Sequence, residues 1–119
     1  MAKIGKNGIV YNGKTYPLVF NLNVMELIQD EYKTVEAWGE LTDINSGKEV
    51  DVKALKFGIT AMLNEGVDEY NDTHEEKRDF FEPKVVGRII SELGMQEMAK
   101  KMNKTVIDSS VDENDIKNK

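Results

Sequence analysis

Residues 8–15, GIVYNGKT, match the phosphate-binding P-loop pattern G-x-x-x-x-G-K-[ST] at Gly8, Gly13, Lys14 and Thr15. Such a loop binds phosphate only when a buried strand precedes it and a helix follows directly, because backbone N–H groups at the helix N-terminus surround the phosphate. Here only seven residues precede the pattern, and the YPLVF stretch after it is strand-like and contains a proline. We therefore interpret the match as a coincidence of spacing and predict no nucleotide or other cofactor.

Histidine and cysteine usage also argues against catalysis and metal binding. His74 is the only histidine, and the sequence has no cysteine, which excludes disulfides, zinc–thiolate sites and thiol catalysis. No serine–histidine arrangement supports His74, and its neighbours predict an exposed position in the first turn of a helix. The sequence thus predicts no catalytic residue, no metal site and no enzymatic activity.

Carboxylates gather in residues 65–82, where eight acidic side chains stand against Lys77 and Arg78. The stretch lacks the glycine and glutamate positions of a calcium-binding loop. A glycosidase-type carboxylate pair would need a cleft, which so small a helical chain is poorly suited to form. We interpret the stretch as a solvated loop and helix face, and the alternative is an electrostatic docking surface for a basic partner.

Three methionines near the C-terminal end are the candidate partner-binding residues. Met95, Met98 and Met102 lie at i, i+3 and i+7, so they share one face of a helix. Methionine at helical spacing usually fills a core, but its flexible side chain also suits adaptable binding surfaces. Because a terminal helix of a small protein is hard to cover completely, we predict that this methionine face binds a partner helix.

The length and composition of the chain indicate what kind of domain holds these residues. The 119 residues suit one domain with a modest core. A formal net charge of −6 and the absence of a basic stretch argue against nucleic-acid binding. The N-terminal MAKIGKNGIVY lacks the apolar region of a signal peptide, and no apolar run reaches the ~18 residues of a membrane span. We expect a soluble, intracellular protein without membrane contact.

Asn12-Gly13 is the strongest local structural signal, because a type I′ hairpin turn needs positive φ at both central residues. A two-residue turn there pairs Ile9 with Tyr16 and places Pro17 where it removes no hydrogen bond from the pair. Since an isolated hairpin is only marginally stable, its apolar face must pack on the rest of the chain.

Downstream of the hairpin, capping residues and apolar spacing predict helices. Asn23 is the expected N-cap of the first helix, and Asp51 that of the clearest one, which Gly66 should end. Thr73 and Glu76 match a capping box of a further helix. The expected helical segments are residues 23–32, 34–41, 51–65, 73–81, 83–93 and 95–102.

Three residues add detail to this reading. Gly58 inside the 51–65 helix costs about 1 kcal/mol relative to Ala, which predicts close packing against a neighbour. Pro83 suits the first position of its helix, and Gly94 suits its end.

The predicted fold is α+β and mostly α, with an N-terminal β-hairpin followed by four to six short helices in a compact bundle. One domain spans residues 1–102, and residues 103–119 form a flexible polar tail.

The order of these segments resembles the small tail assembly chaperones of long, flexible-tailed bacteriophages and prophages of Gram-positive hosts. In that family a Gly-Lys-x-Tyr-x-Leu-x-Phe-[Asn/Asp]-Leu-Asn run opens the domain. The run matches Gly13, Lys14, Tyr16, Leu18, Phe20, Asn21, Leu22 and Asn23. A later helix motif matches Leu55, Gly58, Met62, Leu63, Glu65 and Gly66. The resemblance covers roughly residues 8–102, and its motifs are structural.

The resemblance implies a non-enzymatic role in the cytoplasm of a bacterial host. Members of the family bind the long tape-measure protein while the tail tube polymerises around it, and then leave. The tape-measure protein is thus the expected partner, the tail tube protein is a second candidate, and a homo-oligomer is left open. The alternative function is that of another small phage protein, such as a tail-completion or head–tail joining factor, which would stay in the virion.

Overall fold

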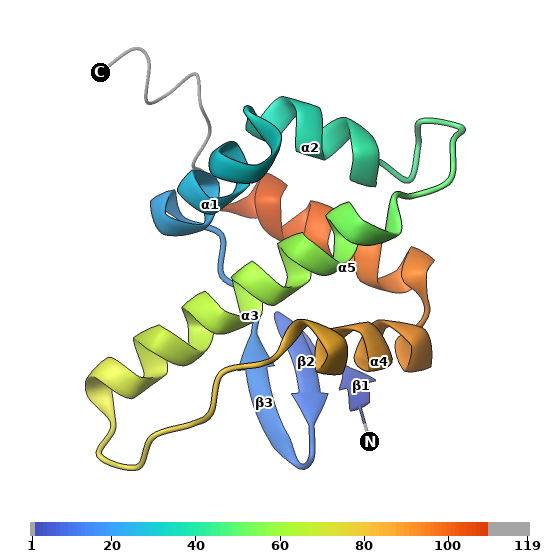
Figure 1. Cartoon of the computed structure of the whole chain (residues 1–119). Coiled ribbons are helices and arrows are strands. Elements are labelled where there is room, and N and C mark those ends of the chain that lie inside the picture. Colours follow the sequence, from blue (N-terminus) through green and yellow to red (C-terminus); the bar gives the residue numbers. More distant parts are fainter. Residues whose placement is uncertain (1, 110–119) are drawn as a thin grey trace.

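The computed structural model describes residues 2–109 as a small antiparallel sheet followed by five helices (Figure 1). The strands, in the order β1-β2-β3, are β1 (Ala2–Ile4), β2 (Gly8–Tyr11) and β3 (Lys14–Pro17). The helices are α1 (Leu22–Tyr32), α2 (Val35–Thr42), α3 (Val52–Thr73), α4 (Pro83–Leu93) and α5 (Met95–Asp108). The predicted class, α+β and mostly α, is confirmed.

The hairpin of β2 and β3 has the predicted turn and register. Asn12 and Gly13 have φ values of 51° and 79°, the positive values that a type I′ turn requires. Ile9 pairs with Tyr16, and both side chains are buried. The hairpin therefore contributes its apolar face to the core, as expected.

Strand β1 was not predicted from the sequence. It pairs with β2 in antiparallel register, with Ala2 opposite Tyr11 and Ile4 opposite Ile9. The backbone N–H of Ala2 also donates to Glu92 Oε1 of α4 at 3.2 Å, and β1 packs against α4. A strand of three residues is too short to show the alternation of apolar and polar residues by which strands are predicted. The contacts of β1 with β2 and α4 therefore determine its conformation.

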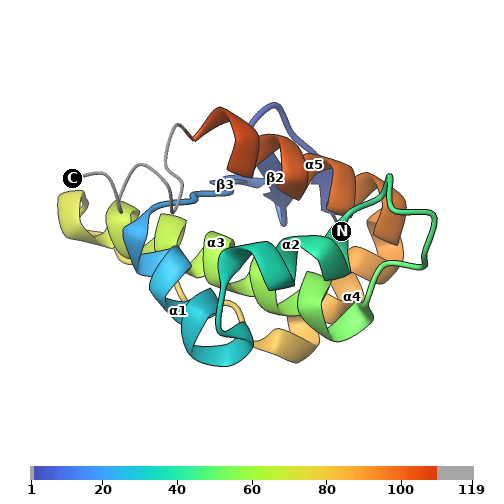
Figure 2. The ribbon, with the colours of Figure 1, turned by 90° about the horizontal axis from the view of Figure 1, so that it is seen from above.

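Helix α3 is the central element and contacts the other four helices and β3. Seen from above, α5 lies on one side of α3, and α1 and α4 lie on the other (Figure 2). A Cβ at Gly58 would lie 2.4 Å from the Trp38 ring and 2.8 Å from the Met102 sulfur. The predicted close packing at Gly58 is confirmed, because α2 and α5 both approach α3 there.

The N-caps of α1 and α3 are set by nearby side chains. Asn21, not Asn23 as predicted, caps α1, and its side-chain oxygen accepts a backbone N–H at 3.2 Å. Asn23 lies in the first turn and donates its side-chain amide to Glu65 Oε2 at 2.9 Å instead. Asp51 is confirmed as the N-cap of α3, where it accepts a backbone N–H at 2.8 Å.

Helix α3 does not end at Gly66, as predicted, but continues to Thr73. A Cβ at Gly66 would lie 2.9 Å from the carbonyl oxygen of Pro17. The glycine therefore allows β3 to approach the helix closely, a role that the local sequence pattern does not distinguish from a helix end.

The predicted helix over residues 73–81 is wrong. Thr73 is the last residue of α3, and its hydroxyl donates to the Tyr70 carbonyl at 3.2 Å instead of forming a capping box with Glu76. Residues 74–82 are non-helical and lead back along α3 to the start of α4. We call this segment, residues 74–82, the strap.

Helix α4 has the predicted start and end. Pro83 is its first residue, and Gly94, at φ 100°, ends it with an N–H···O bond of 2.7 Å to Ile90. None of the helices within residues 2–109 combines the length and apolar character that crossing a bilayer requires.

Helix α5 continues to Asp108, past residue 102, where the folded domain was predicted to end. The side-chain amide of Asn103 donates to the Thr42 carbonyl at 3.2 Å, and Val106 packs against the core. These contacts extend the folded body through the first part of the predicted tail. The rest of that tail, residues 110–119, lies outside the described residues.

Candidate functional site

The residues of the P-loop pattern form the hairpin rather than a phosphate cradle. Lys14 begins β3 directly after the turn and pairs with Tyr11. No helix follows Thr15 until Leu22. Residues 8–15 thus form two paired strands and their turn, and they lack the helix N-terminus that a phosphate-binding loop requires.

His74 lies at the C-terminal end of α3, not in the first turn of a helix as predicted, although it is exposed as predicted. Its ring stacks on Tyr70 with 3.6 Å between centroids, and Nδ1 lies 2.8 Å from the Tyr70 carbonyl oxygen. Among residues 2–109 no group of three or more His, Asp and Glu residues could hold a metal ion.

The acidic stretch 65–82 is divided between two elements. Glu65, Asp68, Glu69 and Asp72 belong to the last turns of α3, whereas its other carboxylates lie on the strap. Glu65 accepts hydrogen bonds from two asparagine amides at the start of α1, at 2.7 and 2.9 Å. Part of the stretch is therefore structural.

The methionine face that was predicted to bind a partner belongs mainly to the core. Met98 and Met102 have no exposed surface, and Met95 is partly buried. The Met102 sulfur packs beside Gly58 of α3. Met98 and Met102 therefore offer no exposed surface, and the prediction that Met95, Met98 and Met102 bind a partner helix stays a prediction.

The strap is fixed to α3 by two asparagine side chains. Asn64 binds Phe81: the Phe81 N–H donates to Oδ1 at 2.7 Å, and Nδ2 donates to the Phe81 carbonyl at 3.0 Å. Asn71 binds both backbone groups of Arg78 in the same way, at 2.8 and 3.0 Å. Because the two asparagines are two helical turns apart, they hold the strap along one face of α3.

The strap is also fixed to the hairpin by aromatic and cationic contacts. The Phe81 ring meets Tyr16 edge-on, with 4.9 Å between centroids, and the Arg78 guanidinium lies 4.8 Å from the centre of the same Tyr16 ring. Arg78 Nη1 also donates to the Thr15 carbonyl at 2.9 Å. These contacts turn Phe81 into the core and leave its neighbour Phe80 57% exposed.

An apolar hollow of about 500 Å³ lies along α3 between α1 on one side and the strap on the other. We call it the α3 groove. Leu27 forms the α1 wall, and Phe80 and Pro83 form the opposite wall. The floor consists of Lys53, Lys56, Phe57, Thr60, Ala61, Asn64, Glu65 and Asp68 of α3. Its volume lies within the roughly 300–1,000 Å³ of typical ligand pockets.

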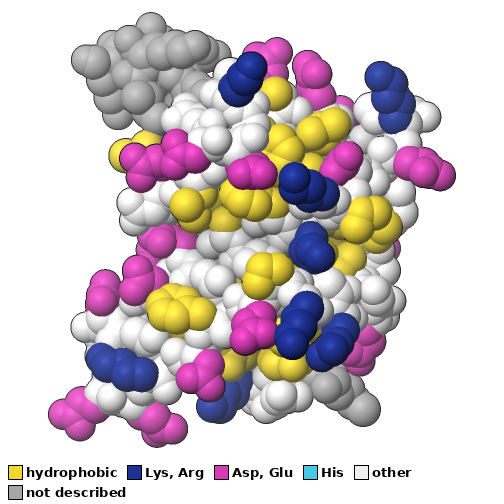
Figure 3. Space-filling model, in the orientation of Figure 1, with side chains coloured by type: hydrophobic (Ala, Val, Ile, Leu, Met, Phe, Trp, Pro, Cys, Tyr) yellow, Lys and Arg dark blue, Asp and Glu magenta, His cyan; other side chains and the backbone are white. Residues whose placement is uncertain are grey.

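Large apolar side chains around the α3 groove are only partly covered. Leu27 is 49% exposed and Phe80 57% exposed, whereas Phe57 is half-buried against the Tyr32 ring, with 5.6 Å between centroids. Figure 3 shows hydrophobic side chains on the face that α1, α3 and the strap present, with basic and acidic side chains around them. Thr60 adds one polar group, a buried hydroxyl with no hydrogen-bond partner among residues 2–109.

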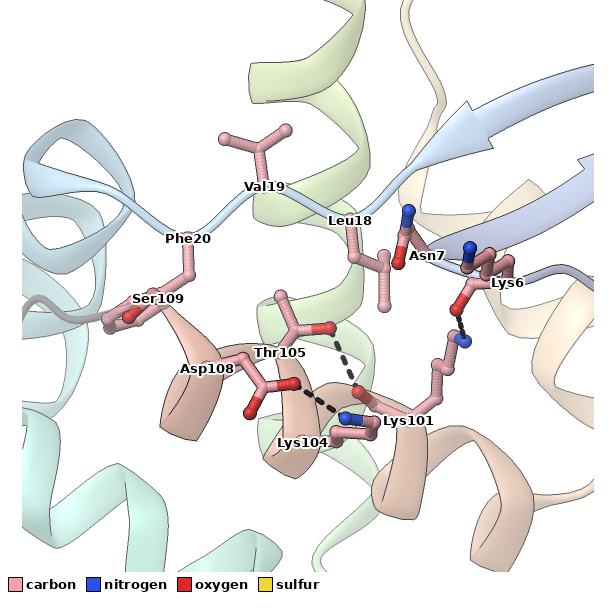
Figure 4. Close-up of a pocket in the computed structure, with 10 residues that line it drawn as sticks. All are labelled: Lys6, Asn7, Leu18, Val19, Phe20, Lys101, Lys104, Thr105, Asp108 and Ser109. Carbon is pink, nitrogen blue, oxygen red and sulfur yellow. Dashed lines mark hydrogen bonds and ion pairs between the residues drawn. The ribbon is translucent and has the colours of Figure 1, made fainter.

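A second hollow, of about 330 Å³, lies between α5 and the segments that flank the hairpin (Figure 4). Its polar groups already bind one another: Lys104 Nζ lies 2.6 Å from Asp108 Oδ2, and Lys101 donates to the Lys6 carbonyl. The Thr105 hydroxyl donates to the Lys101 carbonyl at 2.9 Å. Because Lys101 and Lys104 have partners within the protein, this hollow is a weaker candidate than the α3 groove.

Comparisons with protein-family models, with curated proteins and with solved structures found no match to this chain.

Sequence reasoning missed the residues of the α3 groove, although one signal was present. The pair Phe80-Phe81 lies in a non-helical segment, where neighbouring side chains point to opposite sides. One phenylalanine of such a pair is therefore exposed when the other is buried. The groove itself depends on contacts between distant segments, which no local pattern contains.

Proposed function

We propose that this chain is a non-enzymatic tail assembly chaperone, which binds the tape-measure protein of a bacteriophage in the cytoplasm of the bacterial host. It holds that protein while the tail tube polymerises and then leaves. The observation that carries the proposal is the α3 groove, an apolar surface between two walls on a small acidic protein. The order of motifs from the hairpin to α5 supports the assignment to tail assembly.

The physical properties of the α3 groove suit a temporary holder. Because only about half of Leu27 and of Phe80 is still exposed, burying the rest of each side chain against a partner contributes roughly 1 kcal/mol, which suits recognition without a permanent interface. The groove is lined by eleven residues, fewer than the roughly 20–30 residues that each side of a standard protein–protein interface contributes. The net charge of −6 favours solubility of the complex, since like-charged particles repel one another.

Co-expression with the phage tape-measure protein tests the proposal. The wild-type chain should keep the tape-measure protein soluble and co-purify with it, whereas the double variant Leu27→Ser/Phe80→Ser should lose both effects. Ile107→Ser is the matched control, because Ile107 is 79% exposed and lies outside the groove. Failure of the wild-type chain to bind the tape-measure protein would contradict the proposal.

Mass spectrometry of purified virions distinguishes the chaperone from a retained structural protein. A chaperone that leaves should be absent or present only in traces. Stoichiometric amounts of the chain in virions would instead favour a tail-completion or head–tail joining factor.

A further inference from the structure

Charge is distributed unevenly along the α3 groove. Lys53 and Lys56 lie at the end nearest the start of α3, whereas Glu65 and Asp68 lie at the opposite end of the floor. From Lys53 to Asp68 the helix rises about 22 Å, which is about four turns. The apolar side chains of the groove lie between a basic end and an acidic end.

Helix stability does not account for this arrangement. Lys53 lies in the first turn of α3, where the helix dipole disfavours a cation. Its contact with Glu31 of α1, at 3.7 Å, joins two solvent-exposed side chains, and such pairs stabilise a fold little. Lys53 therefore contributes little to the stability of the fold, and its charge remains available to an acidic ligand.

The shape of the groove indicates the class of ligand. Its floor is one face of a straight helix, and its walls carry exposed apolar side chains, the arrangement that receives an amphipathic helix. We infer that the α3 groove binds an amphipathic helix of about four turns, whose acidic side chains lie against Lys53 and Lys56 and whose basic side chains lie against Glu65 and Asp68. This inference rests on the proposed function in one respect: the proposed function identifies the tape-measure protein as the protein that carries the helix.

Glu65 is preorganised for this role. The Asn21 and Asn23 amides donate to the same carboxylate oxygen, Oε2, so the side chain is fixed at the acidic end of the floor. A basic residue of the ligand then meets a carboxylate that loses little further conformational freedom on binding.

Three designed helical peptides of sixteen residues test the inference. They share one apolar face of Leu and Phe but differ in their ends: one has Glu at one end and Lys at the other, one has Glu at both ends, and one has Lys at both. Fluorescence anisotropy at low salt should give the tightest binding for the mixed peptide. Each of the other two should bind about tenfold more weakly, because one of its ends meets a like charge.

The charge-reversed protein Lys53→Glu/Lys56→Glu should change this order, so that the peptide with Lys at both ends binds best. This result does not depend on the direction in which the helix docks. Lys14→Glu/Lys48→Glu is the control, since it changes the net charge equally at exposed positions outside the groove and should leave the order unchanged. Circular dichroism checks that all variants are folded.

Equal affinity of the wild-type protein for the three peptides, or an unchanged order in the charge-reversed protein, would overturn the inference. Since no phage protein takes part in this assay, its result is independent of the proposed function. Peptides that follow the predicted order while the tape-measure protein fails to bind would contradict the proposed function alone.

Discussion

Asn64 binds both the N–H and the carbonyl group of Phe81, seventeen residues away, with distances of 2.7 and 3.0 Å. This contact places Phe81 in the core against Tyr16 and directs Phe80 to the surface. Together with the matching contact of Asn71 with Arg78, this side-chain amide fixes the strap and thereby the outer wall of the α3 groove.

Replacing Asn64 with Ala should destabilise the protein and weaken binding in the groove. Two partly buried backbone groups of Phe81 would lose their partners, at a cost of about 1–3 kcal/mol. Urea denaturation measures this loss, and binding of the mixed-charge peptide measures the effect on the groove. The control Asn45→Ala, at an exposed loop position, should change the free energy of unfolding by less than about 0.5 kcal/mol. An Asn64→Ala protein with wild-type stability would contradict this account of the strap.

Gly58 and Gly39 provide a matched pair of helix glycines. Gly58→Ala should lower the free energy of unfolding by about 1–3 kcal/mol, because the new methyl group meets the Trp38 ring and this overpacking outweighs the gain in helix propensity. Gly39→Ala should stabilise the protein by up to about 1 kcal/mol, because nothing lies within 4 Å of its Cβ position. Thermal unfolding of both variants checks the prediction, and equal effects at the two sites would refute it.

The Tyr32 hydroxyl should make stability depend on pH at alkaline values. Burial raises the pKa of Tyr32 above its ordinary value of about 10, and the Asp51 and Glu31 carboxylates raise it further. Between the unfolded and folded pKa values the unfolded chain binds fewer protons, so the free energy of unfolding should fall as the pH rises above about 10. Below that pH this contribution is constant.

Tyr32→Phe should remove this part of the alkaline decrease. Because the hydroxyl is buried without a hydrogen-bond partner among residues 2–109, the substitution should be neutral or stabilise by up to about 1 kcal/mol at pH 7. Urea denaturation between pH 7 and 11 measures both effects. A Tyr11→Phe control keeps Tyr32 and should retain the decrease, and an identical pH profile for the wild type and Tyr32→Phe would show that the prediction is wrong.

The features that the sequence predicted correctly are those set by neighbouring residues. Asn12-Gly13 determines its turn through backbone conformation alone, and Asp51, Pro83 and Gly94 act within one helical turn. These effects depend on local geometry, so a short stretch of sequence contains the information that specifies them.

The features that were missed depend on contacts between distant segments. Gly66 resembles a helix end, yet it permits contact with Pro17, forty-nine residues earlier. The methionines at 98 and 102 match both a core and a docking surface, and the contact of Met102 with α3 selects the core. The groove could not be predicted without the position of the strap, which the hydrogen bonds of Asn64 with Phe81 and of Asn71 with Arg78 fix.

The most direct test of the central claim is an NMR titration of the isotope-labelled chain with a tape-measure protein fragment that it binds. If the α3 groove is the docking surface, the amide signals of Leu27, Phe57 and Phe80 should shift, while those of the hairpin turn should not. Shifts confined to α5 around Met95, or to the sheet, would contradict the claim and would place the binding surface elsewhere.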